Sequence, residues 1–111
     1  MDANLLLNHY QRILGASRKM YQFASSEAWD NLIDCEVERR HFVSELRQEL
    51  QSLPNVDLPA EQQEIANNCI REVLTLDQKT RDLAERWMNE LGKDLQTVST
   101  AQRLRRTYLA P

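Results

Sequence analysis

Residues 70–91 read IREVLTLDQKTRDLAERWMNEL, and this stretch decides the fold class. It contains no proline or glycine, and its apolar residues recur at the spacing of an α-helix that buries one face. The same stripe continues beyond both ends of the stretch. Its members are Ile65, Cys69, Val73, Leu76, Leu83, Ala84, Trp87, Leu91, Leu95 and Val98. The pattern therefore predicts one long helix over about residues 60–98.

Two more long helices are predicted before this one. Apolar residues at helical spacing extend over about residues 3–23 and again over about residues 27–51. Ser25 and Ser26 stand between these segments, and serine is a favoured residue at the N-cap of a helix. Glu27 then falls in the first turn of the second helix, where the helix dipole favours an acid. We therefore expect the second helix to begin at this glutamate.

The remaining connections also have sequence signals. SLPNVDLPAEQ at residues 52–62 holds two prolines, which predicts a loop before the third helix. STAQ at residues 99–102 matches a Ser-x-x-Gln capping box, so a short helix is expected over about residues 100–109. Connections this brief favour antiparallel neighbours. The predicted fold is all-α, an antiparallel bundle of three long helices plus a short C-terminal helix, in a single domain over residues 1–111.

The predicted helices differ in length. The second helix would span roughly 37 Å and the third roughly 58 Å. About a dozen residues of the third helix, around Trp87 to Val98, would then extend beyond the second. Their apolar side chains need cover, either from the last helix or from another chain. The first arrangement makes the last helix a displaceable cover, and the second makes the protein a homodimeric helical adaptor.

Composition and charge exclude several classes of function. The 111 residues are 41% hydrophobic and 28% charged, with a net charge of −3, which gives no reason to expect direct binding to nucleic acid. No apolar run approaches the roughly 18 residues of a membrane span, and the start MDANLLLNHYQR lacks the pattern of a signal peptide. We therefore expect no membrane insertion and a place in the cytosol, with Cys35 and Cys69 as free thiols.

Charged residues interrupt the apolar face of the second helix. Glu36 and Arg39 fall inside the arc that its apolar residues define, and Arg40 falls at the edge of that arc. Antiparallel pairing through the 52–62 loop brings Glu36 level with Asp77, a polar interruption of the third helix. We expect these four residues to form an internal polar layer, which fixes the register of the helices rather than catalysing a reaction.

Enzyme motifs are nearly absent. The sequence has no glycine-rich phosphate loop, no nucleophile elbow and no Cys-x-x-Cys pair. ERRH at residues 38–41 has the Glu-x-x-His spacing of di-iron bundles, but the other histidine, His9, has no glutamate three residues before it. His41 is expected to point outward, so a histidine phosphotransfer module remains an alternative. We predict no catalytic residue, no metal site and no cofactor.

One flank of the third helix indicates binding. Ile70, Leu74, Arg81 and Met88 lie beside the centre of the apolar stripe rather than on it. Ile70 and Leu74 are one turn apart and would form an apolar ridge. Either the first helix covers this ridge, or an amphipathic helix of a partner protein lies along it.

Three stretches together resemble one known family. EAWDNLIDCEVERR (27–40) is similar to the Trp-Asp-x-Leu…Glu-Val element of FliT-type flagellar export chaperones. IREVLTLDQKTRDLAERWMNEL (70–91) is similar to the long third helix of that family, including its closing Glu-Leu. STAQRLRRTYL (99–109) resembles the short C-terminal helix, with Leu104 followed four residues later by Tyr108. The likeness covers most of the chain in the same order.

The resemblance implies a cytosolic helical chaperone without catalytic activity. Such proteins bind the C-terminal helical region of the flagellar filament-cap protein, prevent its early assembly and deliver it to the type III export apparatus. Some also bind the export ATPase and the flagellar master transcription regulator. On this sequence, Ile70, Leu74 and Arg81 would meet the client. Leu104 and Tyr108 match the motif of the C-terminal helix, which modulates binding in the family.

Overall fold

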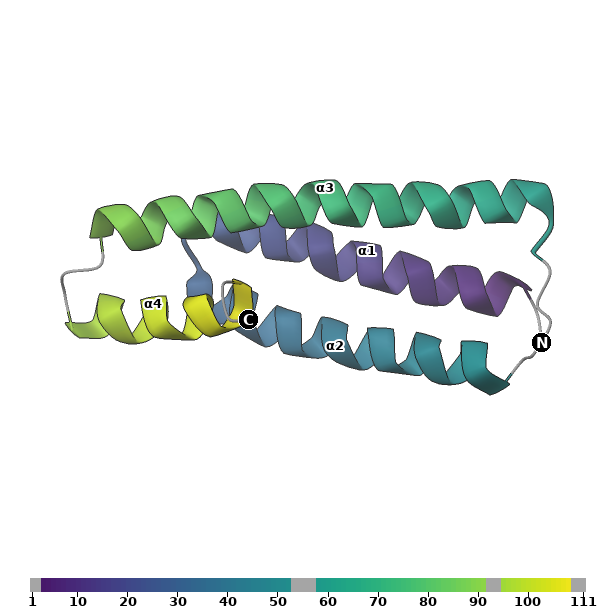
Figure 1. Cartoon of the computed structure of the whole chain (residues 1–111), viewed down its shortest axis with the longest axis horizontal. Helices are drawn as coiled ribbons and strands as arrows, with labels where there is room; N and C mark the ends of the chain where they lie inside the picture. Colours follow the sequence, from purple (N-terminus) through teal and green to yellow (C-terminus); the bar gives the residue numbers. More distant parts are fainter. Residues whose placement is uncertain (1–2, 53–57, 92–94, 109–111) are drawn as a thin grey trace.

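The protein is an elongated bundle of four helices. The computed structural model describes residues 3–52, 58–91 and 95–108. The helices are α1 (Ala3–Ser25), α2 (Trp29–Ser52), α3 (Ala60–Leu91) and α4 (Leu95–Tyr108), and the described residues contain no strand. The molecule measures 52 × 22 × 22 Å, with its helices along the long axis (Figure 1). The predicted all-α class, with three long helices and a short last one, is confirmed.

The helices are not arranged evenly around the core. α1 packs against both α2 and α3, whereas α2 and α3 have no described Cα atoms within 8 Å of each other. α4 packs against α2 and α3 but not against α1. It runs back along the C-terminal end of α3, roughly in line with α2 (Figure 1). α2 and α4 therefore lie alongside successive parts of α3.

The turn between α1 and α2 differs from the prediction. Ser25 and Ser26 do not cap α2, because their hydroxyls donate to the carbonyls of Tyr21 and Gln22 in α1 at 2.9 and 3.0 Å. Glu27 lies outside α2 and has a left-handed backbone, with φ of 58°. Its N–H donates to the carbonyl of Ala24, while the N–H of Ala28 donates to that of Phe23. This pair of bonds is a Schellman motif that ends α1, so α2 begins only at Trp29.

The boundary between α3 and α4 also differs from the prediction. α3 ends at Leu91 rather than near residue 98, and α4 begins at Leu95 rather than near residue 100. Leu95 and Val98 therefore belong to α4 and not to the stripe of α3. Gly92 directly follows the end of α3, and glycine is the residue most often found just past a helix end. The apolar period continues through residues 91–98 because α4 has an apolar face of its own.

The expected overhang of α3 is covered from within the chain. α4 lies along the part of α3 that extends past α2, as the first of the two predicted arrangements requires (Figure 1). Leu104 of α4 is fully buried, and Ala84 and Met88 of α3 belong to the same core cluster. The apolar overhang of α3, which favoured a homodimeric adaptor, is therefore covered by α4 of the same chain.

Buried apolar residues form two clusters. The larger one joins all four helices, and its members are Ala16, Met20, Ala24, Trp29, Leu32, Ile33, Cys35, Ala84, Met88, Ala101 and Leu104. The smaller one lies toward the other end of the bundle and consists of Leu6, Ile13 and Leu46. Several residues pack only partly buried against it, namely Tyr10, Phe42, Val43, Leu58 and Val73. Among the described residues, the larger cluster has eleven buried members and the smaller one three, so more of the core is buried where α4 is present.

Candidate partner-binding groove

An open groove lies between α2 and α3 beyond the end of α4. Its volume is about 510 Å³, and α1 contributes Ile13 to its lining. The remaining lining residues are Glu36, Arg39, Arg40, Val43, Ser44, Arg47, Val73 and Asp77. We call this feature the α2–α3 groove. It exists because α1 separates α2 from α3 and no described helix fills the other side.

Two ion pairs stand in the wall of the α2–α3 groove. Arg39 Nη1 donates to Asp77 Oδ1 at 2.6 Å and to Ser17 Oγ at 2.8 Å, which links α2 with α3 and α1. Arg40 donates to both carboxylate oxygens of Glu36, at 2.8 and 2.6 Å, one turn away on α2. The four residues of the predicted polar layer thus form two pairs. The Arg39 pair is partly buried and joins helices, whereas Arg40 is largely exposed.

The α2–α3 groove is more basic than the chain as a whole. Three arginines and two carboxylates line it, which leaves one excess positive charge on a chain whose net charge is −3. Arg39 and Arg40 are paired, but Arg47 makes no ion pair with another described residue. Val43, Val73 and Ile13 supply apolar surface beside these charges. Such a surface suits an amphipathic helix that has acidic residues along one edge.

The apolar ridge predicted on α3 is exposed. Ile70 has 42% of its surface exposed and Leu74 has 64%, so α1 does not cover the ridge. Leu74 lies three residues before Asp77, on the same flank of α3 that borders the α2–α3 groove. Arg81, one turn further along α3, is also exposed. Helical spacing therefore places the ridge next to Val73 and Asp77, which line the groove.

The other predicted binding residues lie at or under α4. Met88 and Leu104 are buried in the larger core cluster, so a partner reaches them only if α4 moves away. Tyr108 is partly buried against this cluster, and its hydroxyl has no hydrogen-bond partner among the described residues. Burial of the phenol raises the pKa of Tyr108, and the charges of Arg39 and Asp77 also act on it. Tyr108 therefore lies where α4 meets the α2–α3 groove.

The residues considered for chemistry have ordinary surroundings. His41 is exposed, and the described residues contain no group of three side chains suited to holding a metal ion. Cys35 and Cys69 are buried free thiols, as predicted. Burial, reinforced by the nearby charge of Glu38, raises the pKa of the Cys35 thiol, which makes it less reactive. None of the described helices is long and apolar enough to cross a membrane.

These features define an all-helical bundle with an open groove between two of its helices. The family model described as Flagellar protein FliT matches residues 7–110. Flagellar protein FliT from Photorhabdus laumondii subsp. laumondii is 29% identical over 104 residues, which cover 93% of this chain and 80% of that protein. No solved structure matches the chain significantly. The chain belongs to the FliT family of flagellar proteins.

Proposed function

We propose that this protein is a cytosolic export chaperone that binds the C-terminal helical region of the flagellar filament-cap protein. The exposed ridge of Ile70 and Leu74 beside the open α2–α3 groove is the observation that carries this proposal. A subunit whose terminal helices polymerise needs those helices masked before export, and a groove between two helices masks an amphipathic helix well. Membership of a flagellar protein family supports the flagellar context.

The length of the uncovered surface sets the size of the bound segment. α3 has 32 residues and α4 has 14, so they span roughly 48 Å and roughly 21 Å. α4 runs back along α3, which leaves roughly 27 Å of α3 beside the α2–α3 groove. A client helix of about 18 residues fits this length.

The chemistry of the groove sets the sequence pattern of the client helix. Its apolar residues would pack on Val43, Val73 and the Ile70–Leu74 ridge. Its acidic residues would face Arg47, whose charge has no described partner. Displacement of α4, which carries Leu104 away with it, would uncover Ala84 and Met88 on α3 and lengthen the binding surface.

Masking and delivery form one role in this proposal. The bound cap protein stays unassembled until the chaperone passes it to the export apparatus, through contact with the export ATPase. Binding to the flagellar master transcription regulator would add control of flagellar gene expression. The protein itself catalyses no reaction in this scheme.

The test is titration of the chain with a synthetic C-terminal helical segment of the cap protein, followed by calorimetry. We expect binding at micromolar concentrations, weakened at least about tenfold by Ile70→Glu and by Leu74→Glu, because a charge on the ridge must then be desolvated. Absence of binding at micromolar concentrations would contradict the proposal.

Ile65→Glu is the matched control. Ile65 is 43% exposed, nearly the same as Ile70, and lies on the same helix. The two residues are five positions apart, which rotates Ile65 by about 140° away from the ridge. We expect this control to bind the client like the wild type. Equal weakening by both substitutions would place the client elsewhere than on the Ile70–Leu74 ridge.

A further inference from the structure

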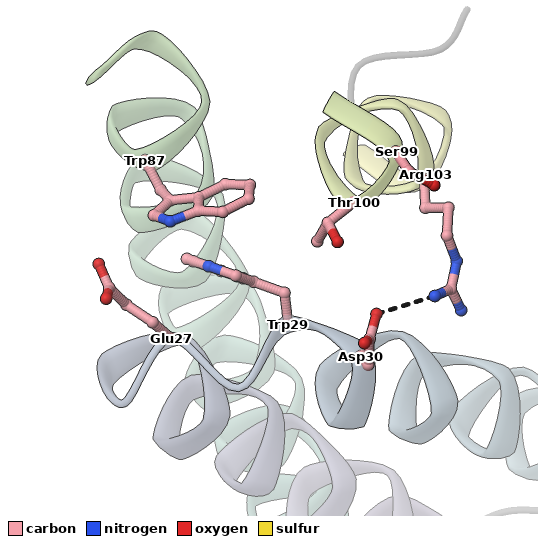
Figure 2. Close-up of a pocket in the computed structure, with 7 residues that line it drawn as sticks. All are labelled: Glu27, Trp29, Asp30, Trp87, Ser99, Thr100 and Arg103. Atoms are coloured by element: carbon pink, nitrogen blue, oxygen red, sulfur yellow. Dashed lines mark hydrogen bonds and ion pairs between the residues drawn. The ribbon is translucent and has the colours of Figure 1, made fainter. Parts of the chain in front are cut away.

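A second hollow lies at the junction of α2, α3 and α4, remote from the Ile70–Leu74 ridge. Its volume is about 420 Å³, and it is lined by Glu27, Trp29, Asp30, Trp87, Ser99, Thr100 and Arg103 (Figure 2). We call it the tryptophan hollow, because the two tryptophans of the chain meet there. It shares no residue with the α2–α3 groove.

Two indoles in tilted contact form the apolar part of the tryptophan hollow. The ring centroids of Trp29 and Trp87 are 5.3 Å apart, with an angle of 44° between the planes. Trp29 is 4% exposed and fixed in the core, whereas Trp87 is only partly buried. In Figure 2 the pair lies between Glu27 on one side and Thr100 of α4 on the other. A partly exposed, rigidly held indole is the preferred ring for contact with a cation.

Glu27 supplies a carboxylate that the fold itself does not use. This carboxylate makes no hydrogen bond or ion pair with another described residue. Asp30, by contrast, accepts a hydrogen bond from Arg103 Nη1 at 2.8 Å, and this pair is neutral overall. The tryptophan hollow therefore has one excess negative charge, located at Glu27. Glu27 and both indoles also line a smaller hollow of about 300 Å³, together with Arg86 and Glu90.

The backbone conformation of Glu27 is a second reason to consider a functional role for its side chain. Its φ of 58° lies in the left-handed region, at the position of the Schellman motif where glycine is the usual residue. A glutamate there is strained, and its side chain makes no described hydrogen bond or ion pair that offsets the strain. Strain of this kind occurs most often at positions where the side chain serves a function.

We propose that the tryptophan hollow binds a lysine or arginine side chain of a partner protein. The cation lies against the exposed face of Trp87 and pairs with the carboxylate of Glu27, while Ser99 and Thr100 offer hydroxyls to the partner backbone. This site is separate from the client groove, so it does not depend on the proposed function. It gives the chain a second protein-binding surface that recognises a basic segment.

The two indole N–H signals in a proton–nitrogen correlation spectrum provide the test, because the chain has only two tryptophans. The probes are N-acetyl-arginine amide and N-acetyl-citrulline amide, which have nearly the same shape and differ in charge. We expect the arginine probe to shift the Trp87 signal saturably at millimolar concentrations, with a response to citrulline at least about fivefold weaker. Equal responses to the two probes would overturn the proposal.

Substitutions at Glu27 test whether its carboxylate is the group that pairs with the cation. Glu27→Gln should weaken the response to the arginine probe at least about fivefold, whereas Glu64→Gln, the same charge change on an exposed residue of α3, should leave it unchanged. Glu27→Gly should abolish the response and raise the melting temperature, because glycine relieves the left-handed strain. A wild-type response in Glu27→Gln, or equal losses in Glu27→Gln and Glu64→Gln, would overturn the assignment.

Discussion

The C-terminal half of α3 lies under α4, whereas its N-terminal half borders the open α2–α3 groove (Figure 1). Under α4, Ala84 and Met88 are buried in a cluster that joins four helices. Beside the groove, Val73 is only partly buried, and Ile70 and Leu74 are exposed. One helix with one continuous apolar period thus contains a closed half and an open half. The difference lies in whether the chain itself provides a covering helix.

The Arg39–Asp77 ion pair lies near the border between the two halves. It joins α2 to α3 at 2.6 Å, although these helices do not pack directly against each other. The charges of this pair also act on Tyr108, close to the end of α4. We therefore propose that the Arg39–Asp77 pair holds α2 and α3 in register at the point where the covering helix ends.

The largest expected loss of stability comes from removing a buried side chain that packs on the closed half of α3. Leu104 is 0% exposed, so Leu104→Ala removes a fully buried side chain and leaves a cavity among Trp29, Ala84 and Met88. We expect a loss of about 2–5 kcal/mol in the free energy of unfolding, measured by urea denaturation.

Leu50→Ala is the control in the open half. Leu50 is exposed, so this substitution should cost less than about 1 kcal/mol. Similar losses of unfolding free energy in the two variants would contradict the view that the half of the bundle under α4 is packed more tightly than the half beside the groove.

The helical period predicted the open half of α3 better than the closed half. Ile70 and Leu74 were expected on a flank of the stripe, and the flank position follows directly from 3.6 residues per turn. Their exposure did not follow, because the period alone cannot say which helix covers a flank. Met88 occupies the same flank but is buried, since α4 happens to cover that level.

The two incorrect boundaries have local causes. At Glu27, the left-handed conformation is unusual for a residue other than glycine, so the Schellman motif that ends α1 there could not be predicted from the residue type. At Leu91, the signal was present, because Gly92 follows, but two consecutive helices with apolar faces imitated one long stripe. The tryptophan hollow could not be foreseen, because Trp29 and Trp87 lie on different helices and meet only in the tertiary structure.

A smaller loss of stability is expected from breaking the Arg39–Asp77 ion pair, where the two halves of α3 meet. Asp77→Ala leaves the partly buried Arg39 without its carboxylate, so the free energy of unfolding should fall by about 1–3 kcal/mol. The double variant Arg39→Met with Asp77→Ala should lose less than the sum of the two single variants, because neither charge is then left unpaired. Thermal and urea unfolding of the four proteins measure this coupling.

The exposed pair of Arg12 and Glu45 is the matched comparison. Both side chains are nearly half exposed, so Glu45→Ala should cost no more than about 1 kcal/mol. If Asp77→Ala were equally mild and strictly additive with Arg39→Met, the Arg39–Asp77 pair would have no part in holding α2 and α3 in register.

Tyr108→Phe is expected to change stability least at neutral pH. The difference in stability from the wild type should grow as the pH rises. The hydroxyl of Tyr108 is buried without a described partner, so its removal at neutral pH should change the free energy of unfolding by less than about 1 kcal/mol. Burial raises the pKa of Tyr108 in the folded protein, whereas a tyrosine in the unfolded chain titrates near about 10. Above that pH the unfolded chain releases the phenolic proton and the folded protein keeps it.

The wild type should therefore lose stability as pH rises above about 10, by up to about 1.4 kcal/mol per pH unit from this group, while Tyr108→Phe lacks that contribution. Urea unfolding of both proteins at about pH 8 and about pH 11 measures the difference, in which contributions common to the two proteins cancel. Parallel pH profiles would mean that the Tyr108 phenol is already open to water. α4 would then leave its last turn unpacked, and the closed half of the bundle would end before the level of Asp77.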